Sequence, residues 1–255
     1  MTMQAVALPA FRDNYLWCLV HEGRALVVDP GDAAVVEQWL KEQQLHLSYL
    51  LITHHHADHI GGLGELLERH QPVVYGPDEG IAGIQHILRG GEALSLDGFG
   101  HVDVLAIPGH TRAHIAYYLP EPALLFCGDT LFSAGCGRLF EGTPAQMYQS
   151  LQSLAALPDE TRVCCSHEYT EANLHFAAVV EPDNRSRQAR SEEVALLRAA
   201  GKPSLPVLLG QERRYNPFLR CAVPAVIQQA SQEAGQALGA GLATFTALRA
   251  WKDRF

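Results

Sequence analysis

The segment 53–59, with the sequence THHHADH, constrains the fold of this chain more than any other feature. In an extended loop, alternate side chains lie on one side, so His54 and His56 can bind one ion through neutral imidazole. Asp58 and His59, at the start of a following helix, can reach a second ion. Other parts of the chain must then supply the remaining ligands.

Four apolar runs share one property, because each of them ends within a few residues of a possible metal ligand. The runs are 49–52, 104–107, 124–127 and 163–165, and they lead into 53–59, His110, Asp129 and His167. Functional loops gather at strand ends in layered α/β folds. If the four strands are neighbours, their ends place five histidines and two aspartates at one edge of the core. The carboxylate of Asp129 has two oxygens and can bridge two ions.

Each of these short motifs also has a simpler interpretation. A run of histidines is compatible with a solvated loop, and the Gly-His, Gly-Asp and Ser-His pairs taken singly are typical of turns or caps. Taken together they favour a metal centre. Two divalent ions can lower the pKa of a bound water toward neutrality and polarise a carbonyl. Such a centre suits hydrolysis of an ester, thioester, amide or phosphodiester, and the lack of an H-E-x-x-H motif argues against a zincin-type protease.

Charge and cysteine usage narrow the partners and the compartment. The chain has 19 Lys+Arg against 28 Asp+Glu, a formal charge of −9 that makes nucleic acid a poor candidate partner. No apolar stretch approaches the ~18 residues of a membrane span, and 1–10 lacks the pattern of a signal peptide. Six cysteines without C-x-x-C spacing are expected to be reduced and buried. We therefore expect a cytoplasmic protein that binds neither nucleic acid nor membrane. We also expect a monomer.

Strand and helix patterns alternate through roughly residue 170, after which helical patterns dominate. Strands are expected at 4–8, 15–20, 25–28, 47–52, 73–75, 102–107, 115–119, 124–127 and 162–165. Helices are expected at 33–43 with Asp32 as the cap, within 59–69, and at 145–157, 171–180, 187–200 and 225–238. The glycines at 61 and 62 permit a close backbone approach. The change of pattern predicts one domain at 1–172 and a second, helical domain at 173–255.

The metal-ligand motif and several longer segments resemble known proteins. The H-x-H-x-D-H signature of the metallo-β-lactamase superfamily is present at 54–59. Further segments resemble glyoxalase II, the hydroxyacylglutathione hydrolase family: 53–62, 128–138, 140–143, 167–170 and 249–253. The resemblance covers nearly the whole chain, including the helical tail.

This resemblance implies an α+β four-layer αββα sandwich, the metallo-β-lactamase fold, with a C-terminal helical domain that covers the site. Two divalent ions per chain are implied, zinc being expected and iron or manganese being alternatives. Residues matching His54, His56 and His110 hold one ion, those matching Asp58, His59 and His167 hold the other, and the one matching Asp129 bridges them. The implied reaction is hydrolysis of S-D-lactoylglutathione to D-lactate and glutathione, the second step of methylglyoxal detoxification. A bridging hydroxide would attack the thioester, with Asp58 and Asp129 as catalytic residues.

The family's glutathione contacts correspond to Arg138, Tyr169, Arg249 and Lys252. Cationic side chains can pair with the glycine carboxylate of glutathione, so these residue types suit the ligand. Phe140 departs from the tyrosine often found at its position and lacks the hydroxyl. A second departure is a serine at 166, where glycine is usual.

Three other functions remain open at this point. One is a metal-dependent hydrolase acting on a lactone, a β-lactam or a phosphodiester, which the basic ending at 249–252 disfavours. Another is an iron-dependent persulfide dioxygenase with a mononuclear site, which the complete second ligand set disfavours. The third is a non-catalytic metal-binding module.

Overall fold

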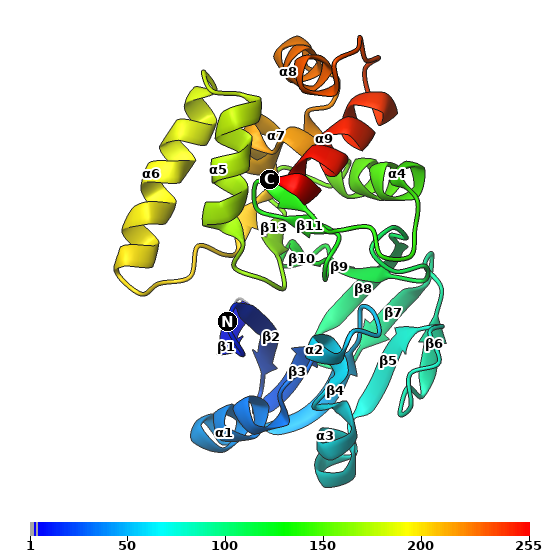
Figure 1. Ribbon diagram of the computed structural model, residues 1–255. Coiled ribbons are helices and arrows are strands. Elements are labelled where there is room, and N and C mark those ends of the chain that lie inside the picture. Colours follow the sequence, from blue (N-terminus) through cyan, green and yellow to red (C-terminus); the bar gives the residue numbers. More distant parts are fainter. Residues whose placement is uncertain (1–2, 4) are drawn as a thin grey trace.

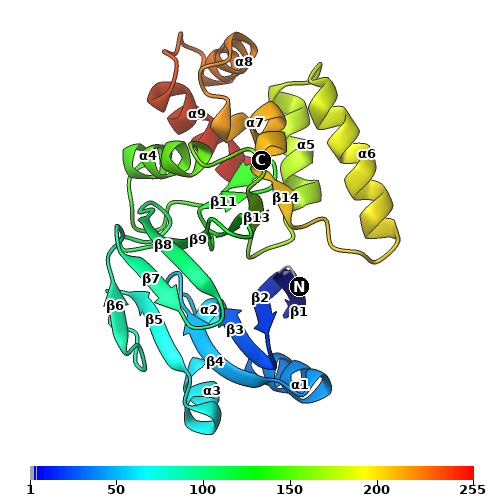
Figure 2. The ribbon, with the colours of Figure 1, turned by 180° about the vertical axis from the view of Figure 1, so that it is seen from behind.

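Two six-stranded mixed sheets lie face to face in the computed structural model, which describes residue 3 and residues 5–255 (Figures 1 and 2). The first sheet has the order β1 (Ala5–Ala10), β2 (Asn14–His21), β3 (Arg24–Val28), β4 (His46–Leu51), β5 (Val73–Pro77) and β6 (His86–Leu88). Strands β1 to β3 are antiparallel, and β3 to β6 are parallel. Residue 4, which begins the expected strand 4–8, lies outside the described residues, as do 1 and 2 of the segment 1–10.

The second sheet collects strands from more distant parts of the chain. Its order is β14 (Val207–Leu208), β13 (Arg162–Cys164), β10 (Leu124–Phe126), β9 (Ile115–Leu119), β8 (Gly100–Ala106) and β7 (Ala93–Leu96). Neighbours are antiparallel except for β10 and β13, which are parallel. A small hairpin, β11 (Leu131–Phe132) with β12 (Gly135–Cys136), follows β10. Because β10 and β13 are parallel neighbours, the residues that follow them, Asp129 and His167, lie side by side.

The first sheet is buried on both faces, which explains why its strands read as continuous apolar runs. In β2, Trp17 and Leu19 belong to the large core cluster between the sheets, whereas Leu16 and Cys18 belong to a second cluster. Successive strand residues point to opposite faces, so the two clusters lie on opposite sides of the sheet. The second cluster includes Val36, Leu40 and Leu66, which come from helices packed on the outer face.

Helix α1 (Ala33–Gln43) has the predicted bounds and the predicted cap, since Asp32 Oδ1 accepts hydrogen bonds from the backbone nitrogens of Ala34 and Val35 at 2.9 and 3.3 Å. One hydrogen-bonded cap of this kind typically stabilises a helix by about 1 kcal/mol.

The single helix expected within 59–69 is instead two helices, α2 (Ala57–Ile60) and α3 (Leu63–His70). The glycines between them allow close packing: a Cβ on Gly61 would lie 2.6 Å from the carbonyl oxygen of Gly31, and one on Gly62 would be equally crowded. The expected close backbone approach is confirmed. It breaks the helix directly after the ligand-bearing turn.

The remaining helices cover the outer face of the second sheet. They are α4 (Pro144–Ala155), α5 (Thr170–Val180), α6 (Arg185–Ala199), α7 (Leu209–Tyr215), a 3-10 turn (Pro217–Leu219), α8 (Pro224–Ala234) and α9 (Leu242–Arg254). Phe245 and Leu248 of α9 and Leu151 of α4 are fully buried in the core that also contains the second sheet. In Figure 1, α5 to α9 gather on the side of this sheet away from β1 to β6. The layers therefore run helix, sheet, sheet, helix, as the four-layer fold requires, with the helical region added to the second outer layer.

The tail differs from the helices expected at 171–180, 187–200 and 225–238 in three elements, because β14, α7 and α9 were not predicted. Strand β14 lies within it and pairs with β13, Val207 opposite Val163, as the edge of the second sheet. Two residues are too few to show an alternating pattern. Helix α7 carries a fully buried Glu212, which interrupts its apolar pattern. Within the described part of the chain, no helix is both long and apolar enough to cross a membrane.

Candidate metal centre

The predicted ligands converge where the strands of the two sheets end. His54 and His56 follow β4, His110 follows β8, Asp129 follows β10 and His167 follows β13, whereas Asp58 and His59 lie in α2. Their ligand atoms fall into two groups, and the atoms within each group lie within 4.8 Å of one another; a third group of this kind joins Asp29 to His54 and His59. We define the first group as His54, His56, His110 and Asp129, and the second group as Asp58, His59 and His167.

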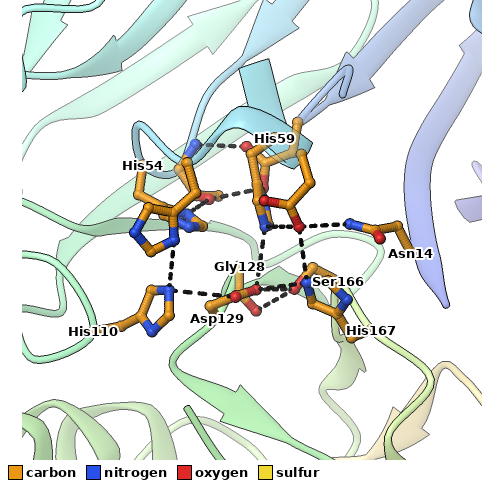
Figure 3. A network of polar contacts seen from close by, with 12 residues as sticks. Asn14, His54, His59, His110, Gly128, Asp129, Ser166 and His167 are labelled. Carbon is orange, nitrogen blue, oxygen red and sulfur yellow. Dashed lines mark hydrogen bonds and ion pairs between the residues drawn. The ribbon is translucent and has the colours of Figure 1, made fainter. Parts of the chain in front are cut away.

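Asp129 lies between the two groups and presents one oxygen to each (Figure 3). Its Oδ1 is 3.3 Å from His59 Nε2 and 3.4 Å from His167 Nε2, whereas its Oδ2 is 3.3 Å from His110 Nε2. His167 Nε2 is also 3.4 Å from Asp58 Oδ2. A carboxylate in this position can be a ligand of two neighbouring cations at once.

Four of the five histidines have one ring nitrogen held by the protein and the other directed to the centre. The Nδ1 atom of His54 donates to Thr53 Oγ1 at 3.0 Å, and the Nδ1 atom of His110 donates to the carbonyl oxygen of Arg138 at 2.9 Å. The Nδ1 atoms of His59 and His167 each donate to a carboxylate. With Nδ1 as the donor, Nε2 is the atom available to a cation. His56 differs, since its Nδ1 faces His110 Nε2 at 3.0 Å.

Two buried nitrogens test whether these residues fit a metal ion. His54 Nε2 and His59 Nε2 are buried and make no hydrogen bond within residues 5–255, the 3.3 Å approach of His59 Nε2 to Asp129 Oδ1 being an ion-pair contact only. Buried polar atoms without partners are uncommon in proteins, because each carries a desolvation cost of about 1–3 kcal/mol. Imidazole and carboxylate donors are typical ligands of zinc, iron and manganese. The donor set and the unpartnered atoms therefore fit divalent cations.

The two groups have different electrostatics. Burial, helped by the neighbouring His59 and His114, holds the pKa of His54 well below its ordinary value, and burial also lowers the pKa of His110. In the second group burial acts in the same direction but is outweighed, since Asp129 and Asp58 raise the pKa of His167 to about 10. First-group imidazoles are therefore neutral at pH 7, whereas a cation in the second group must displace protons.

One carboxylate outside the ligand groups supports a histidine of each. Asp29 Oδ2 accepts a hydrogen bond from His59 Nδ1 at 3.0 Å and another from Thr53 Oγ1 at 2.7 Å, and that hydroxyl in turn holds His54. Asp29 was not among the predicted site residues, because in the sequence it reads as the start of a turn before a Pro-Gly pair. Only its contacts across the fold identify its role.

Two further histidines are explained by their surroundings. His55 faces away from the centre, as expected, and lies 2.8 Å from Glu79 and 3.3 Å from Glu141. His114, which has no motif around it, is fully buried and stacks on His54 with ring centroids 4.5 Å apart. Its Nε2 accepts a hydrogen bond from the backbone nitrogen of Asp129 at 3.2 Å. His114 therefore forms a wall of the centre that sequence reasoning missed.

A cavity of about 550 Å³ opens beside His110 and Asp129. The four residues that the resemblance assigned to glutathione all line it, namely Arg138, Tyr169, Arg249 and Lys252. The Tyr169 ring stacks on His167, with centroids 4.7 Å apart and planes 5° apart. This cavity therefore joins the metal centre to three cationic side chains of the loop after β12 and of α9.

The three cations of the cavity differ in how strongly the protein holds them. Arg249 is buried and donates from Nη1 to the carbonyl oxygen of Cys136 at 2.8 Å and from Nη2 to Asp253 at 2.9 Å. The side chain of Arg138 is 67% exposed and has Asp253 3.9 Å from its Nε. Lys252 Nζ lies 3.4 Å from the carbonyl oxygen of Ala172, and burial lowers the pKa of this lysine.

Phe140 is the most accessible aromatic side chain at the centre. It is 63% exposed, and its ring lies 5.6 Å from that of His56 and 5.2 Å from that of His110, edge to face in both cases. The absent hydroxyl therefore leaves an apolar surface beside the first group.

Known proteins resemble this chain over its whole length. A family model described as "Hydroxyacylglutathione hydrolase C-terminus" matches residues 168–255, and one described as "Metallo-beta-lactamase superfamily" matches residues 12–167. A hydroxyacylglutathione hydrolase of Dechloromonas aromatica is 52% identical over 262 residues, covering 97% of this chain and 98% of the relative. One of Photobacterium profundum is 51% identical, and the match covers both chains completely. The crystal structure of ETHE1 from Myxococcus xanthus is 26% identical, with a TM-score of 0.65 and coverage of 99% of this chain and 98% of that one.

Proposed function

This chain belongs to the hydroxyacylglutathione hydrolase family of the metallo-β-lactamase superfamily, and from that membership we propose that it hydrolyses S-D-lactoylglutathione and related S-2-hydroxyacylglutathiones. It is a thioester hydrolase, and its products are glutathione and the free 2-hydroxy acid, D-lactate in the first case. The observation that carries this conclusion is the match at about half identity along the entire chain, across both the ligand-bearing part and the helical tail.

The enzyme uses divalent metal ions, and we propose two per chain, with zinc as the metal. The first ion would be held by His54, His56 and His110. The second ion would be held by Asp58, His59 and His167. Asp129 would be a ligand of both ions. Ions held there would supply a water with its pKa lowered toward 7 and a Lewis acid for the thioester carbonyl. The unpartnered Nε2 atoms of His54 and His59 support this assignment.

The chain's own residues orient the reacting groups. Asn14 Nδ2 donates to Asp58 Oδ2 at 2.9 Å, and the Asp58 side chain is 40% exposed at the centre. The remaining acceptor positions of that carboxylate can therefore orient the attacking water. A thiolate is a good leaving group, so the cleavage of the C–S bond needs no strong general acid. Asp58 and Asp129 are accordingly the carboxylates to which we assign catalytic roles.

We assign substrate binding to the cationic cavity. Arg138 and Lys252 can pair with the carboxylates of the glutathione moiety, because both carry a charge and remain accessible. Arg249 contributes positive charge from the cavity wall, and Tyr169 offers a hydroxyl beside His167. The Phe140 ring would face the acyl side of the bound thioester, next to the first group.

Domain division, assembly and location complete the proposal. We place the catalytic domain at 1–172 and the helical substrate-binding domain at 173–255. We propose that the enzyme is a monomer in the cytoplasm, where glutathione thiols stay reduced. Its six cysteines, all free thiols, are typical of proteins from a reducing compartment. Light scattering during size-exclusion chromatography checks the monomer.

The decisive experiment follows the absorbance of S-D-lactoylglutathione with purified enzyme, before and after chelation. Fast hydrolysis that chelation abolishes and added metal restores is the expected result. A lactone, a β-lactam and a phosphodiester serve as alternative substrates, and oxygen uptake with a persulfide tests for dioxygenase chemistry. Metal-loaded enzyme that leaves the thioester intact while turning over one of these alternatives would contradict the proposal.

A further inference from the structure

The start of β2 is joined to the segment that carries His167. The backbone nitrogen of Tyr15 donates to the carbonyl oxygen of Ser166 at 2.7 Å, and the backbone nitrogen of Glu168 donates to the carbonyl oxygen of Asp13 at 2.8 Å. Asn14 thus lies directly opposite His167 in an isolated antiparallel bridge. This bridge links the first sheet to the exit of β13 in the second sheet. It places the side chains of Asp13 and Asn14 at the metal centre.

Both side chains contact ligands of the second group. Asp13 Oδ1 accepts a hydrogen bond from His167 Nδ1 at 2.8 Å, and Asn14 Nδ2 donates to Asp58 Oδ2 at 2.9 Å (Figure 3 shows Asn14 beside this carboxylate). Neither side chain hydrogen-bonds to His54, His56 or His110 in the part of the chain that the structure describes. The support is therefore confined to one half of the centre.

The first group is held by other parts of the protein. Thr53 and the carbonyl oxygen of Arg138 fix the rings of His54 and His110, as described above. Asp29 supports His59 in the second group and, through Thr53, His54 in the first group, so its loss would affect both groups. The side-chain hydrogen bonds of Asp13 and Asn14 to these ligands therefore reach the second group alone.

We propose that Asp13 and Asn14 are positioning residues for the second metal ion alone, an inference that rests on the two-ion centre proposed above. The Asp13 carboxylate fixes the ring of His167 with Nε2 toward the ion and increases the electron density on that nitrogen. Asn14 occupies one lone pair of Asp58 Oδ2, which fixes the rotation of the carboxylate and directs its other lone pairs. Loss of such an outer contact typically weakens metal affinity by about 10–100-fold.

The experiment titrates chelated protein with Zn²⁺ against a competing colorimetric chelator and counts bound zinc by mass spectrometry after desalting. Wild type is compared with Asp13→Ala, Asp13→Asn and Asn14→Ala. The matched control is Asp103→Ala, because Asp103 Oδ1 contacts His101 Nε2 at the same 2.8 Å on the exposed surface of β8. Circular dichroism and the melting temperature of the chelated proteins verify that every variant is folded.

The expected result is selective. Wild type and Asp103→Ala bind two zinc ions, whereas Asp13→Ala and Asn14→Ala keep the first at wild-type affinity and bind the second about 10–100-fold more weakly. Asp13→Asn retains an acceptor for His167 Nδ1, so it recovers part of the lost affinity. Variants that bind both ions as wild type does, or that lose both ions equally, would overturn the inference. If wild type itself binds fewer than two ions, the proposed two-ion centre is wrong. If wild type binds two ions and the variants do too, only the role of Asp13 and Asn14 is wrong, so the two failures are distinguishable.

Discussion

Two buried polar clusters in this protein satisfy their atoms in opposite ways. One is the metal centre. The other, which we call the Glu212 cluster, consists of Glu212 with Ser133, Ala134, Tyr215 and Asn216. Glu212 is completely buried, and its carboxylate accepts hydrogen bonds from Ser133 Oγ and Tyr215 OH at 2.7 Å, from the Ala134 nitrogen at 2.8 Å and from Asn216 Nδ2 at 3.0 Å. Both carboxylate oxygens are therefore supplied by the protein, whereas the metal centre leaves imidazole nitrogens without partners.

The difference separates a structural cluster from a ligand-binding one. Asn216 Nδ2 also donates to the carbonyl oxygens of Phe132 and Gly135, so the Glu212 cluster holds the turn of the β11–β12 hairpin. Phe132 and Cys136 of that hairpin line the cationic cavity. A buried charge whose every atom has a protein partner fixes a shape. A buried group with atoms left over, at a site of typical metal ligands, indicates a bound cation.

Removal of the metal ions should produce the largest difference between the clusters. Chelated enzyme is expected to lose all measurable hydrolysis, because the centre then lacks its source of activated water. An ion present at 100 times its dissociation constant stabilises the fold by about 2.7 kcal/mol, so chelation should also lower the melting temperature. Calorimetry with and without added zinc checks this. Full activity in protein shown to be metal-free would contradict it.

The Asp129→Ala substitution should produce the second-largest loss of activity. The variant loses the carboxylate whose two oxygens face the Nε2 atoms of His110 in the first group and of His59 and His167 in the second group, and kcat is expected to fall by about 10²–10³-fold, the range seen when one charge-stabilising group is removed. Steady-state kinetics together with zinc counting make the measurement. Near-normal turnover with two ions bound would remove Asp129 from the mechanism.

Substitution of Glu212 should change the stability of the protein and leave its metal content unchanged. Glu212→Leu strands several buried donors and is expected to lower the unfolding free energy by about 2–3 kcal/mol. Glu212→Gln is the matched control, because the hydroxyls of Ser133 and Tyr215 can turn to accept from the new amide. It should remain near wild type in urea denaturation. Loss of zinc from either folded variant would show that the clusters are not independent.

The pH dependence of stability should separate chelated from metal-loaded enzyme. In the chelated protein the raised pKa of His167, about 10, stabilises the fold fully below the unfolded pKa of about 6.5. This contribution is lost as the pH rises from there to about 10, at up to about 1.4 kcal/mol per pH unit. Metal-loaded protein has already released that proton and should show a flatter profile. Urea denaturation measures the unfolding free energy of both forms from pH 6.5 to 9.5. The same pH dependence in chelated and metal-loaded enzyme would contradict this assignment.

Ser166 should give the smallest effect. Its hydroxyl lies 2.5 Å from Asp129 Oδ1, the oxygen that faces the second group, and 2.8 Å from the carbonyl oxygen of Gly128. A hydrogen bond to this oxygen reduces the electron density available to a cation, so Ser166→Ala should strengthen binding of the second ion. We expect a few-fold change, about the strength of one modest hydrogen bond. Zinc titration measures it, and weaker binding would reverse the assigned role.

Local sequence patterns predicted much of the fold because they depend on neighbouring residues. Helix α1 and its Asp32 cap have their predicted bounds, and β9 occupies its predicted range. The short strands β7 and β14 were not predicted, because neither is long enough to show an alternating pattern. The three-residue strands β10 and β13 were predicted, because each lies in a continuous apolar run. The exit of β13 could be predicted in sequence, but not that β2 would cross it at Asn14.

The sequence by itself predicted which side chains would meet at the candidate metal centre. Five of the seven predicted ligands follow a strand end within five residues, and Asp58 and His59 lie in the short helix α2 that comes next, so their positions follow from local structure and the order of the apolar runs. Tertiary structure alone decided which groups hold those ligands. Asp13 is 154 positions from His167, Asn14 is 44 from Asp58, and Glu212 is 79 from Ser133. No local pattern encodes such pairs, because they arise only when sheets and helices that fold separately are packed against one another.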